Sequence, residues 1–528
     1  MALQEIAQLA FSGGTNAVAA PARVGNRQIF RVRNLVLGEH GSLSTRPGYT
    51  VVSTGSDTTN PLVYVNVLSL TNGTSRLYAV QNDGVVNTVY RADTDPWTNV
   101  GSTVQSYTTP QAVTVLDHEV FAMGYEPPWL WNGDTTWTQI TAAAGQTLPP
   151  GARHLAFHLG SLWLWNTSAA TTTLDGPSSL RMSDANNVNS WPLANQTFIS
   201  RDDGQVGMGL ATFTVVETGI SPTATMIAFK NYSAYQITGV FGASNFSIQK
   251  TKSDMGCVAP RTIQFVSGYG IIRLAHKGFA LFNGVDDRLI SEEIRPYLVG
   301  QDDIPGINWQ AVDRGFAVQS QNPPMYIAAL PTQSTYLDRV FVYDLVRRAW
   351  TICDFPINFQ SMVLFSTVGV QPEIRAGRNT SGQVVRIFNN DTSDNGSGIA
   401  WSFRSRTFSV GSHLRPAFWR RFVLDLLFAP AQSVTVNTTL GGFTSALSST
   451  RSYTGATVGS TYSSAVYSQG TYGTGLTNTV DDLQSVEIIR TSPSAYVTVT
   501  GTGNIRVRGL AFHASPKPVT RRVTGGVL

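Results

Sequence analysis

The chain has 528 residues, of which 42% are hydrophobic, 10% aromatic and only 13% charged, whereas soluble proteins average about 25% charged residues. This apolar and aromatic content excludes intrinsic disorder, because a disordered chain has too few such residues to form a core. The two cysteines, Cys257 and Cys353, exclude a disulfide framework and a CxxC metal site, and they fit folding in a reducing cytoplasm.

Residues 1–54 are expected to form an N-terminal arm and a lead-in strand. Glu5 is acidic where a signal peptide would be basic, and no apolar run approaches the roughly 20 residues of a membrane span. We therefore expect neither secretion by a signal peptide nor insertion into a membrane.

Residues 55–400 consist of short segments rich in Val, Ile, Thr and aromatic residues, separated by Gly, Asn, Asp and Pro. This pattern predicts strands, and the chain is expected to be all-β. A two-residue apolar element followed by a turn recurs with a mean spacing near 50 residues, at Tyr90, Trp131, Leu180, Tyr235, Phe282, Tyr343 and Phe388. A four-stranded blade needs about that length, so the repeat predicts a β-propeller of about seven blades, with a series of generic hairpins as the alternative.

Residues 401–528 are expected to form a C-terminal β-sandwich-like domain with a Ser-, Thr- and Gly-rich excursion at 431–480 and a basic tail. This part carries a net charge of +8, so residues 1–400 carry −4. Arg outnumbers Lys 32 to 5 in the whole chain, which favours planar, bidentate contacts.

Six arginines of this basic part are candidate contacts to a neighbouring subunit or to DNA in a channel. The plainer interpretation is that arginines pair with acids or stack on aromatic rings at subunit contacts. The candidates are Arg404, Arg406, Arg420, Arg421, Arg506 and Arg508.

Catalytic and metal-binding patterns are weak in this sequence. His154 and His158 share one face of a predicted strand, but they lie too far apart for routine chelation and no HExxH motif is present. Adjacent acids such as Asp202 and Asp203 point to opposite faces of a strand and are better interpreted as turn formers. We therefore expect no enzyme activity, no metal site and no cofactor.

A cluster of tryptophans offers the main alternative. Trp131 and Trp163 could form an aromatic platform that stacks on sugars, although packing in the outer part of a blade is the simpler interpretation. The platform would suit a receptor- or glycan-binding adhesin on a propeller. A sialidase-like glycosidase is the third possibility, but the nearest S-x-D-x-G-x-x-W turn, at Ser183–Trp191, lacks the glycine and the spacing.

Several segments, in this order along the chain, resemble the tail nozzle or lower tail-tube proteins of short-tailed bacteriophages and the related packaged-DNA stabilisation proteins. None is a catalytic motif, and they cover about residues 10–290, with a weaker match at RPAFWRRFVLDL. They are FSGG (Phe11–Gly14), RPGY (Arg46–Tyr49), SD and SWP (Ser183–Pro192), DDG before GL (Asp202–Leu210), YQITG (Tyr235–Gly239), GCVAP (Gly256–Pro260), and GF with FNG (Gly278–Gly284).

The resemblance implies a structural virion protein that is made in the host cytoplasm and assembles as a ring of six copies in the phage tail. Its implied partners are the tail adaptor and portal-proximal proteins, tail fibres or spikes and, transiently, the genomic double-stranded DNA. The ring would close the channel on packaged DNA and conduct it during ejection. Residues 431–480 depart from the family pattern, so a terminal nozzle and an intermediate ring both remain open.

The composition agrees with this interpretation on physical grounds. Each phosphate contact by Lys or Arg adds salt-dependent affinity for DNA, so a densely basic wall would hold the duplex. A wall with few charges and many hydroxyls would let the duplex slide past.

Overall fold

The computed structural model describes residues 3–517 except 56–58, 105–109, 125, 169–174, 216–222, 302, 368–369, 380, 412–415, 429–431, 442–446 and 455–479. Most of the predicted excursion at 431–480 and the end of the basic tail therefore lie outside the described residues. By contacts the chain divides into two compact units, one of residues 1–48, 342–354 and 392–528 and the other of residues 49–341 and 355–391.

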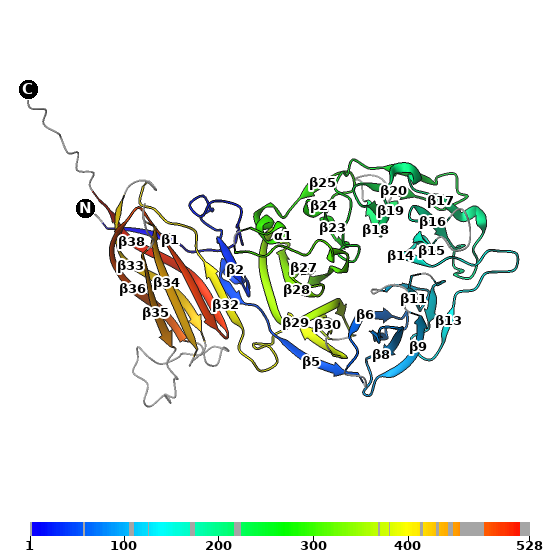
Figure 1. Cartoon of the computed structure of the whole chain (residues 1–528), viewed down its shortest axis with the longest axis horizontal. Coiled ribbons are helices and arrows are strands. Elements are labelled where there is room, and N and C mark those ends of the chain that lie inside the picture. Colours follow the sequence, from blue (N-terminus) through cyan, green and yellow to red (C-terminus); the bar gives the residue numbers. More distant parts are fainter. Residues whose placement is uncertain are drawn as a thin grey trace, which may run out of the picture. The chain divides into compact units, whose positions relative to one another are not determined.

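The described residues confirm the all-β prediction and form seven four-stranded blades around a centre (Figure 1). Apolar residues occupy the blade strands because each blade packs on both neighbours, and polar residues with Gly and Asn occupy the turns. Blades 1 to 3 consist of β6 (Leu62–Ser69), β7 (Ser75–Asn82), β8 (Val86–Arg91) and β9 (Thr98–Val104); β10 (Gln111–Val115), β11 (His118–Ala122), β12 (Trp129–Trp131) and β13 (Trp137–Gln139); and β14 (Ala152–His158), β15 (Ser161–Thr167), β16 (Ser179–Met182) and β17 (Gln196–Phe198).

Blades 4 and 5 repeat this order of antiparallel neighbours. They consist of β18 (Gly207–Val215), β19 (Thr223–Lys230), β20 (Ala234–Thr238) and β21 (Ser247–Lys250), and of β22 (Gln264–Val266), β23 (Gly270–Ala275), β24 (Gly278–Phe282) and β25 (Asp287–Leu289). Four short 3-10 helices lie between strands of the propeller region: η2 (Leu193–Asn195), η3 (Arg201–Asp203), η4 (Glu292–Ile294) and η5 (Val312–Arg314). The α-helix α1 is Arg295–Val299.

Blades 6 and 7 share one seven-stranded sheet because the long strand β29 is the last strand of one and the first of the other. The strands, in sheet order, are β26 (Phe316–Gln321), β27 (Pro324–Pro331), β28 (Leu337–Asp344), β29 (Ala349–Phe365), β30 (Glu373–Arg378), β31 (Gln383–Ile387) and β5 (Tyr49–Thr54). A register shift in the β29–β30 ladder lies between Phe359 and Ser361. Strand β5, from far earlier in the chain, pairs antiparallel with β31 and completes blade 7.

The sequence repeat corresponds to one position in the blade. Its first six anchors, among them Trp131, lie in the third strands β8, β12, β16, β20, β24 and β28, and Phe388 directly follows β31, the third strand of blade 7. The propeller of about seven blades is thus confirmed, because the spacing measured the length of one blade.

The remaining strands form a β-sandwich. One sheet, sheet A, has the order β3 (Leu35–Leu37), β4 (Leu43–Thr45), β38 (Ile505–Pro516), β33 (Ala417–Phe428) and β36 (Val480–Ser492), and β1 (Gln4–Gln8) pairs with β38. The other, sheet C, has the order β2 (Arg31–Arg33), β32 (Ala400–Arg404), β37 (Ser494–Thr502), β34 (Ser433–Gly441) and β35 (Leu447–Thr454), and η1 (Glu39–Gly41) lies between β3 and β4.

The sandwich core joins both ends of the chain. Phe11, Val32 and Leu43 pack with Trp419 and Phe512 in one cluster of buried side chains. The observed division therefore differs from the expected 1–54, 55–400 and 401–528: residues 1–48 are part of the sandwich instead of an arm, and 49–54 are the closing strand of the propeller. The reason is long-range strand pairing, which a local pattern does not encode.

Candidate functional site

The six candidate arginines lie on two different sheets of the sandwich. Arg404 ends β32 of sheet C, and Arg406 follows it closely. The other four lie on sheet A, Arg420 and Arg421 in β33 and Arg506 and Arg508 in β38. Since the two sheets pack through their inner faces, the outward-pointing arginines of sheet C and of sheet A do not form one site.

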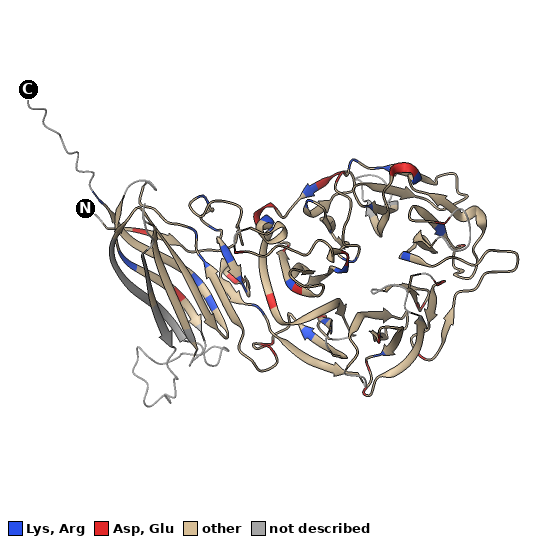
Figure 2. Cartoon of the chain, in the orientation of Figure 1, with Lys and Arg blue, Asp and Glu red and all other residues tan. Residues whose placement is uncertain are grey.

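On sheet C, arginines lie on the neighbouring strands β2 and β32 (Figure 2). Arg31 and Arg404 are directly opposite each other in the β2–β32 ladder, and Arg33 lies two residues further along β2. Like charges opposite each other destabilise a sheet, and aromatic rings offset this cost. The Arg404 guanidinium lies 4.1 Å from the Tyr496 ring centre and 4.9 Å from that of Phe30.

We call Arg31, Arg33, Arg404 and Arg406 the basic face of sheet C. Arg33 is well exposed and pairs with Asp354 at 2.8 Å. Burial lowers the pKa of Arg406, whose guanidinium lies 4.5 Å from the centre of the Phe408 ring.

The rest of this outer surface is made of hydroxyls and amides. Alternate residues of β34 and β37 point away from the core, and those described are Ser, Thr, Asn, Tyr or Gly, with no acid among them. Arginine forks and hydroxyl groups are both common donors to phosphate oxygens. The surface can therefore contact a polyanion without a reacting group.

Sequence reasoning missed Arg31 and Arg33, because residues 1–54 were expected to form an arm. The signal was present in the alternation of Arg31-Val-Arg33, which places both arginines on one face of any strand. The buried Val32 between them confirms that alternation.

The four candidate arginines of sheet A differ in their exposure and in their partners. Arg420 and Arg421 are both exposed, since a register shift between Trp419 and Arg421 interrupts the alternation of β33. Arg508 is paired with Asp425, the Nη2–Oδ1 distance being 2.6 Å, whereas Arg506 lies opposite Leu427. Arg508 thus pairs with an acid of its own chain, and contacts of these arginines to a neighbouring subunit or to DNA stay a prediction.

The proposed aromatic platform is corrected by the structure. Trp131 and Trp163 are both 0% exposed, and their indole nitrogens donate to the backbone carbonyls of Asp134 and His158. Wide side chains fill the space between neighbouring blades, so these two rings are core residues and cannot stack on a sugar.

The two histidines of β14 are also buried. Burial lowers the pKa of His154 to about 3 although its Nε2 lies 3.0 Å from the Gly207 carbonyl, and burial lowers the pKa of His158 as well. In the described part of the chain no group of three or more His, Cys, Asp or Glu is placed to hold a metal ion. Nor does any described helix have the length and apolar character needed to cross a bilayer.

Two of the segments that resemble the tail proteins, RPGY and GCVAP, take part in buried hydrogen bonds that hold the fold together. Arg46 of the RPGY segment is 1% exposed and forms a two-pronged ion pair with Asp394, with nitrogen–oxygen distances of 2.9 and 2.7 Å. Its Nε donates to Asn34 Oδ1 at 3.1 Å, and further bonds reach the carbonyls of Pro47 and Asp354. Such complete pairing is what allows a guanidinium to be buried.

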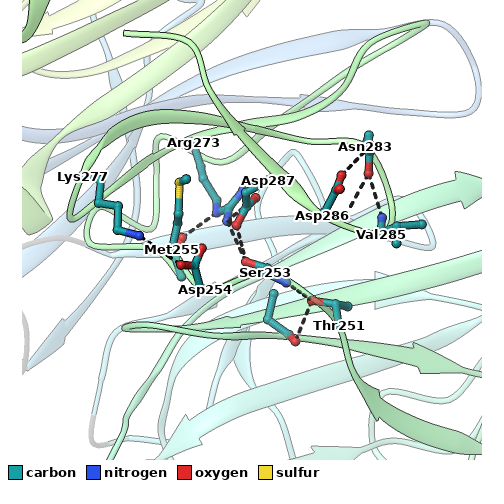
Figure 3. A network of polar contacts seen from close by, with 12 residues as sticks. Thr251, Ser253, Asp254, Met255, Arg273, Lys277, Asn283, Val285, Asp286 and Asp287 are labelled. Carbon is teal, nitrogen blue, oxygen red and sulfur yellow. Dashed lines mark hydrogen bonds and ion pairs between the residues drawn. The ribbon is translucent and has the colours of Figure 1, made fainter. Parts of the chain in front are cut away.

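A second buried arginine joins blades 4 and 5 (Figure 3). Arg273 of β23 is 0% exposed; its Nη2 donates to both carboxylate oxygens of Asp287 at 2.8 Å, and its Nε donates to the Gly256 carbonyl at 2.6 Å. The guanidinium also lies 4.2 Å from the ring centre of Phe229 in blade 4. The GCVAP segment therefore supplies a structural bond between blades.

No family model matches the chain, and no curated protein matches it. Among solved structures, BBS1N in complex with ARL6DN, soaked with mercury, matches with 10% identity and a TM-score of 0.40, over 65% of this chain and 98% of that one. The lead-soaked form of the same complex has 9% identity and a TM-score of 0.37, over 66% and 97% of the two chains. The N-terminal domain of Nup159 has 11% identity and a TM-score of 0.26, over 62% and 76%.

Proposed function

We propose that this protein is a structural virion protein without catalytic activity, which forms a ring of six copies in the tail of a short-tailed phage. The ring, a nozzle or a section of tail tube, closes the channel on packaged DNA and conducts the DNA during ejection. Its neighbours are the tail adaptor and portal-proximal proteins and the fibres or spikes.

The observation that carries the proposal is the placement of the residues shared with the tail proteins. Arg46, which follows strand β4, forms an ion pair with Asp394, which precedes strand β32. Tyr49 begins β5, the strand that completes blade 7. Gly256 of the GCVAP segment accepts a hydrogen bond from Arg273 at the contact between blades 4 and 5. Because these residues secure the scaffold, the resemblance supports a shared rigid building block and, with it, a role in assembly.

The DNA channel of this proposal lies between copies of the protein and not inside one propeller. The cavity at the centre of the propeller has a volume of about 450 Å³, which is in the range of small-molecule sites and too small to pass a DNA duplex. A ring of copies joined head to tail provides a wider opening. The basic face of sheet C, with its neighbouring hydroxyls, is the surface best suited to contact phosphates in that opening.

Electron microscopy of the purified protein, alone and mixed with the portal–adaptor complex of the same phage, tests the proposal. We expect closed rings or density at the end of the tail. A protein that stays monomeric in both samples and never joins the adaptor complex would overturn the proposal.

A further inference from the structure

The cavity at the centre of the propeller is a built polar site that the proposed tail function does not use. The first strand or the preceding loop of each of the seven blades contributes to its wall, from Tyr64 in blade 1 to Met362 in blade 7. Its volume of about 450 Å³ falls in the range of about 300–1,000 Å³ typical of small-molecule sites.

Among the described residues that line the cavity, Arg261 is the only charged one. Its side chain is more than nine-tenths buried, its Nη2 donates to the Arg314 carbonyl at 2.8 Å, and its Nη1 has no hydrogen-bond partner among the described residues. Phe316 lies against it, with 5.4 Å between the guanidinium and the ring centre.

The surroundings of Arg261 compensate its charge only in part. No described carboxylate forms an ion pair with it, and burial lowers its pKa to about 10. The charge of Asp313 favours the charged form of Arg261 without an ion pair between them, and a buried cation that is only partly balanced in this way is unfavourable. An anion bound in the cavity would remove that cost, which makes the charge a source of ligand affinity.

The rest of the polar wall consists of neutral donors and acceptors. Tyr64 accepts a hydrogen bond from Asn66 at 3.2 Å, and its own hydroxyl proton has no acceptor among the described residues. Gln264 donates to the Ala317 carbonyl at 2.9 Å and keeps its amide oxygen as an acceptor. Gln111 and Gln319 also line the cavity, and these groups together suit the hydroxyls of a polar ligand.

We propose that the central cavity of the propeller binds one small organic oxyanion, a carboxylate or phosphate group on a hydroxylated body, with Arg261 as its counter-charge. The amides of Gln111, Gln264 and Gln319 hold the body. This site does not depend on the tail function proposed above, and a monomeric protein would contain it.

Isothermal titration of the full chain with three probes of matched body tests the site: glucuronate, glucose 6-phosphate and uncharged glucose. We expect one site per chain and at least tenfold tighter binding of one or both acids than of glucose. The two acids tell a carboxylate site from a phosphate site. Equal binding of all three probes, or no saturable binding of either acid, overturns the proposal without any variant.

Variants then locate the site. Arg261→Gln should abolish the preference for the acid, whereas Gln319→Leu should weaken the binding of acid and glucose alike. Arg288→Gln, at an exposed position on β25, the last strand of blade 5, should change neither. Circular dichroism and a thermal melt check that each variant folds. If Arg261→Gln does not fold, Arg261→Lys takes its place and should reduce the preference; an unchanged preference in a folded Arg261 variant contradicts the assignment.

Discussion

Glu119 is a carboxyl group buried where blades 1 and 2 meet. Tyr78 of blade 1 donates to it at 2.7 Å and Thr114 donates at 2.8 Å. Burial raises its pKa from 4.5 to about 7 despite these two bonds. The folded protein therefore holds a proton on Glu119 at pH values where the unfolded chain has released it.

Because of this proton, the contribution of Glu119 to the free energy of unfolding decreases as the pH rises. A raised folded-state pKa gives stability that is complete below pH 4.5 and is lost as the pH rises toward 7. A difference of this size corresponds to about 3 kcal/mol, as an upper order of magnitude. Burial lowers the pKa of His154 from 6.5 to about 3, which contributes a slope of the opposite sign up to about pH 6.5, so the prediction concerns a difference between two proteins. In urea unfolding at pH 5, 6, 7 and 8, the stability of the wild type relative to Glu119→Gln should decline as the pH rises.

Asp117 is the matched control for Glu119. It lies two residues away, is exposed, and has a pKa lowered by its hydrogen bonds from Thr71. Its titration therefore lies below the tested window, and Asp117→Asn should leave the slope between pH 5 and 8 unchanged. A Glu119→Gln protein that keeps the full wild-type slope would show that another group causes it.

Arg273 and Lys277 allow a buried and an exposed ion pair to be compared within one blade (Figure 3). The Arg273–Asp287 pair is 0% and 2% exposed, whereas Lys277 and Asp254, 3.0 Å apart, are 47% and 71% exposed. Arg273→Met leaves a buried carboxylate unpaired and should lower the free energy of unfolding by about 3–5 kcal/mol. Lys277→Met should lower it by less than about 1 kcal/mol. Denaturant titration measures the free energy of unfolding of both variants. Equal decreases in the two variants would contradict the role of Arg273 as a buried contact between blades.

At the scale of the element, the turn after blade 4 brings backbones together at Gly256. Its φ is +56°, and an added Cβ would lie 2.2 Å from the Asn231 carbonyl oxygen. Gly242 also has a positive φ, +79°, but has no atom within 4 Å of that position. Both alanine variants carry the backbone strain, so Gly256→Ala should cost about 1–3 kcal/mol more than Gly242→Ala because of overpacking. Thermal melts of the two variants measure the difference, and equal costs would show that the Asn231 backbone moves aside.

The first 54 residues serve both folded parts of the chain. Phe11, Ile29, Val32, Leu35 and Leu43 belong to the sandwich core, and β5 completes blade 7. Burial of one such side chain contributes about 1.5–3 kcal/mol, so the five together approach the roughly 5–15 kcal/mol stability of a whole domain.

A chain of residues 55–528 should therefore fail to unfold cooperatively and should be poorly soluble. Co-expression with a separate 1–54 peptide should restore a soluble complex that copurifies. Size-exclusion chromatography and calorimetry measure both outcomes. A 55–528 chain that melts at the temperature of the full protein would contradict the assignment of residues 1–54 to the sandwich and blade 7.

At the scale of the whole molecule, the exposed pair Arg420 and Arg421 is the surface to test in assembly. If it bridges subunits, the double variant Arg420→Glu, Arg421→Glu should fold normally and form far fewer rings in electron micrographs. Arg153→Glu, on the exposed side of the propeller strand β14, serves as the control. Particles that assemble normally and only lose their genome would assign these arginines to DNA instead of to a neighbouring subunit.

The sequence by itself determined the all-β class and the seven blades. Alternation of apolar residues and the spacing of anchors such as Trp131 and Phe282 are local signals, and a blade is built from one continuous stretch of chain. The sequence also indicated the turn role of Asp202 and Asp203, which lie in η3.

Only the tertiary structure decided which distant residues meet. Pairing of β5 with β31, and of Arg46 with Asp394, joins positions more than 300 residues apart. The same long-range packing buries Trp131 and Trp163, aligns Arg31 with Arg404, and closes the cavity around Arg261. A local pattern shows that a residue will be in a strand, but its partner, and thus its burial and charge environment, depends on how the whole chain closes.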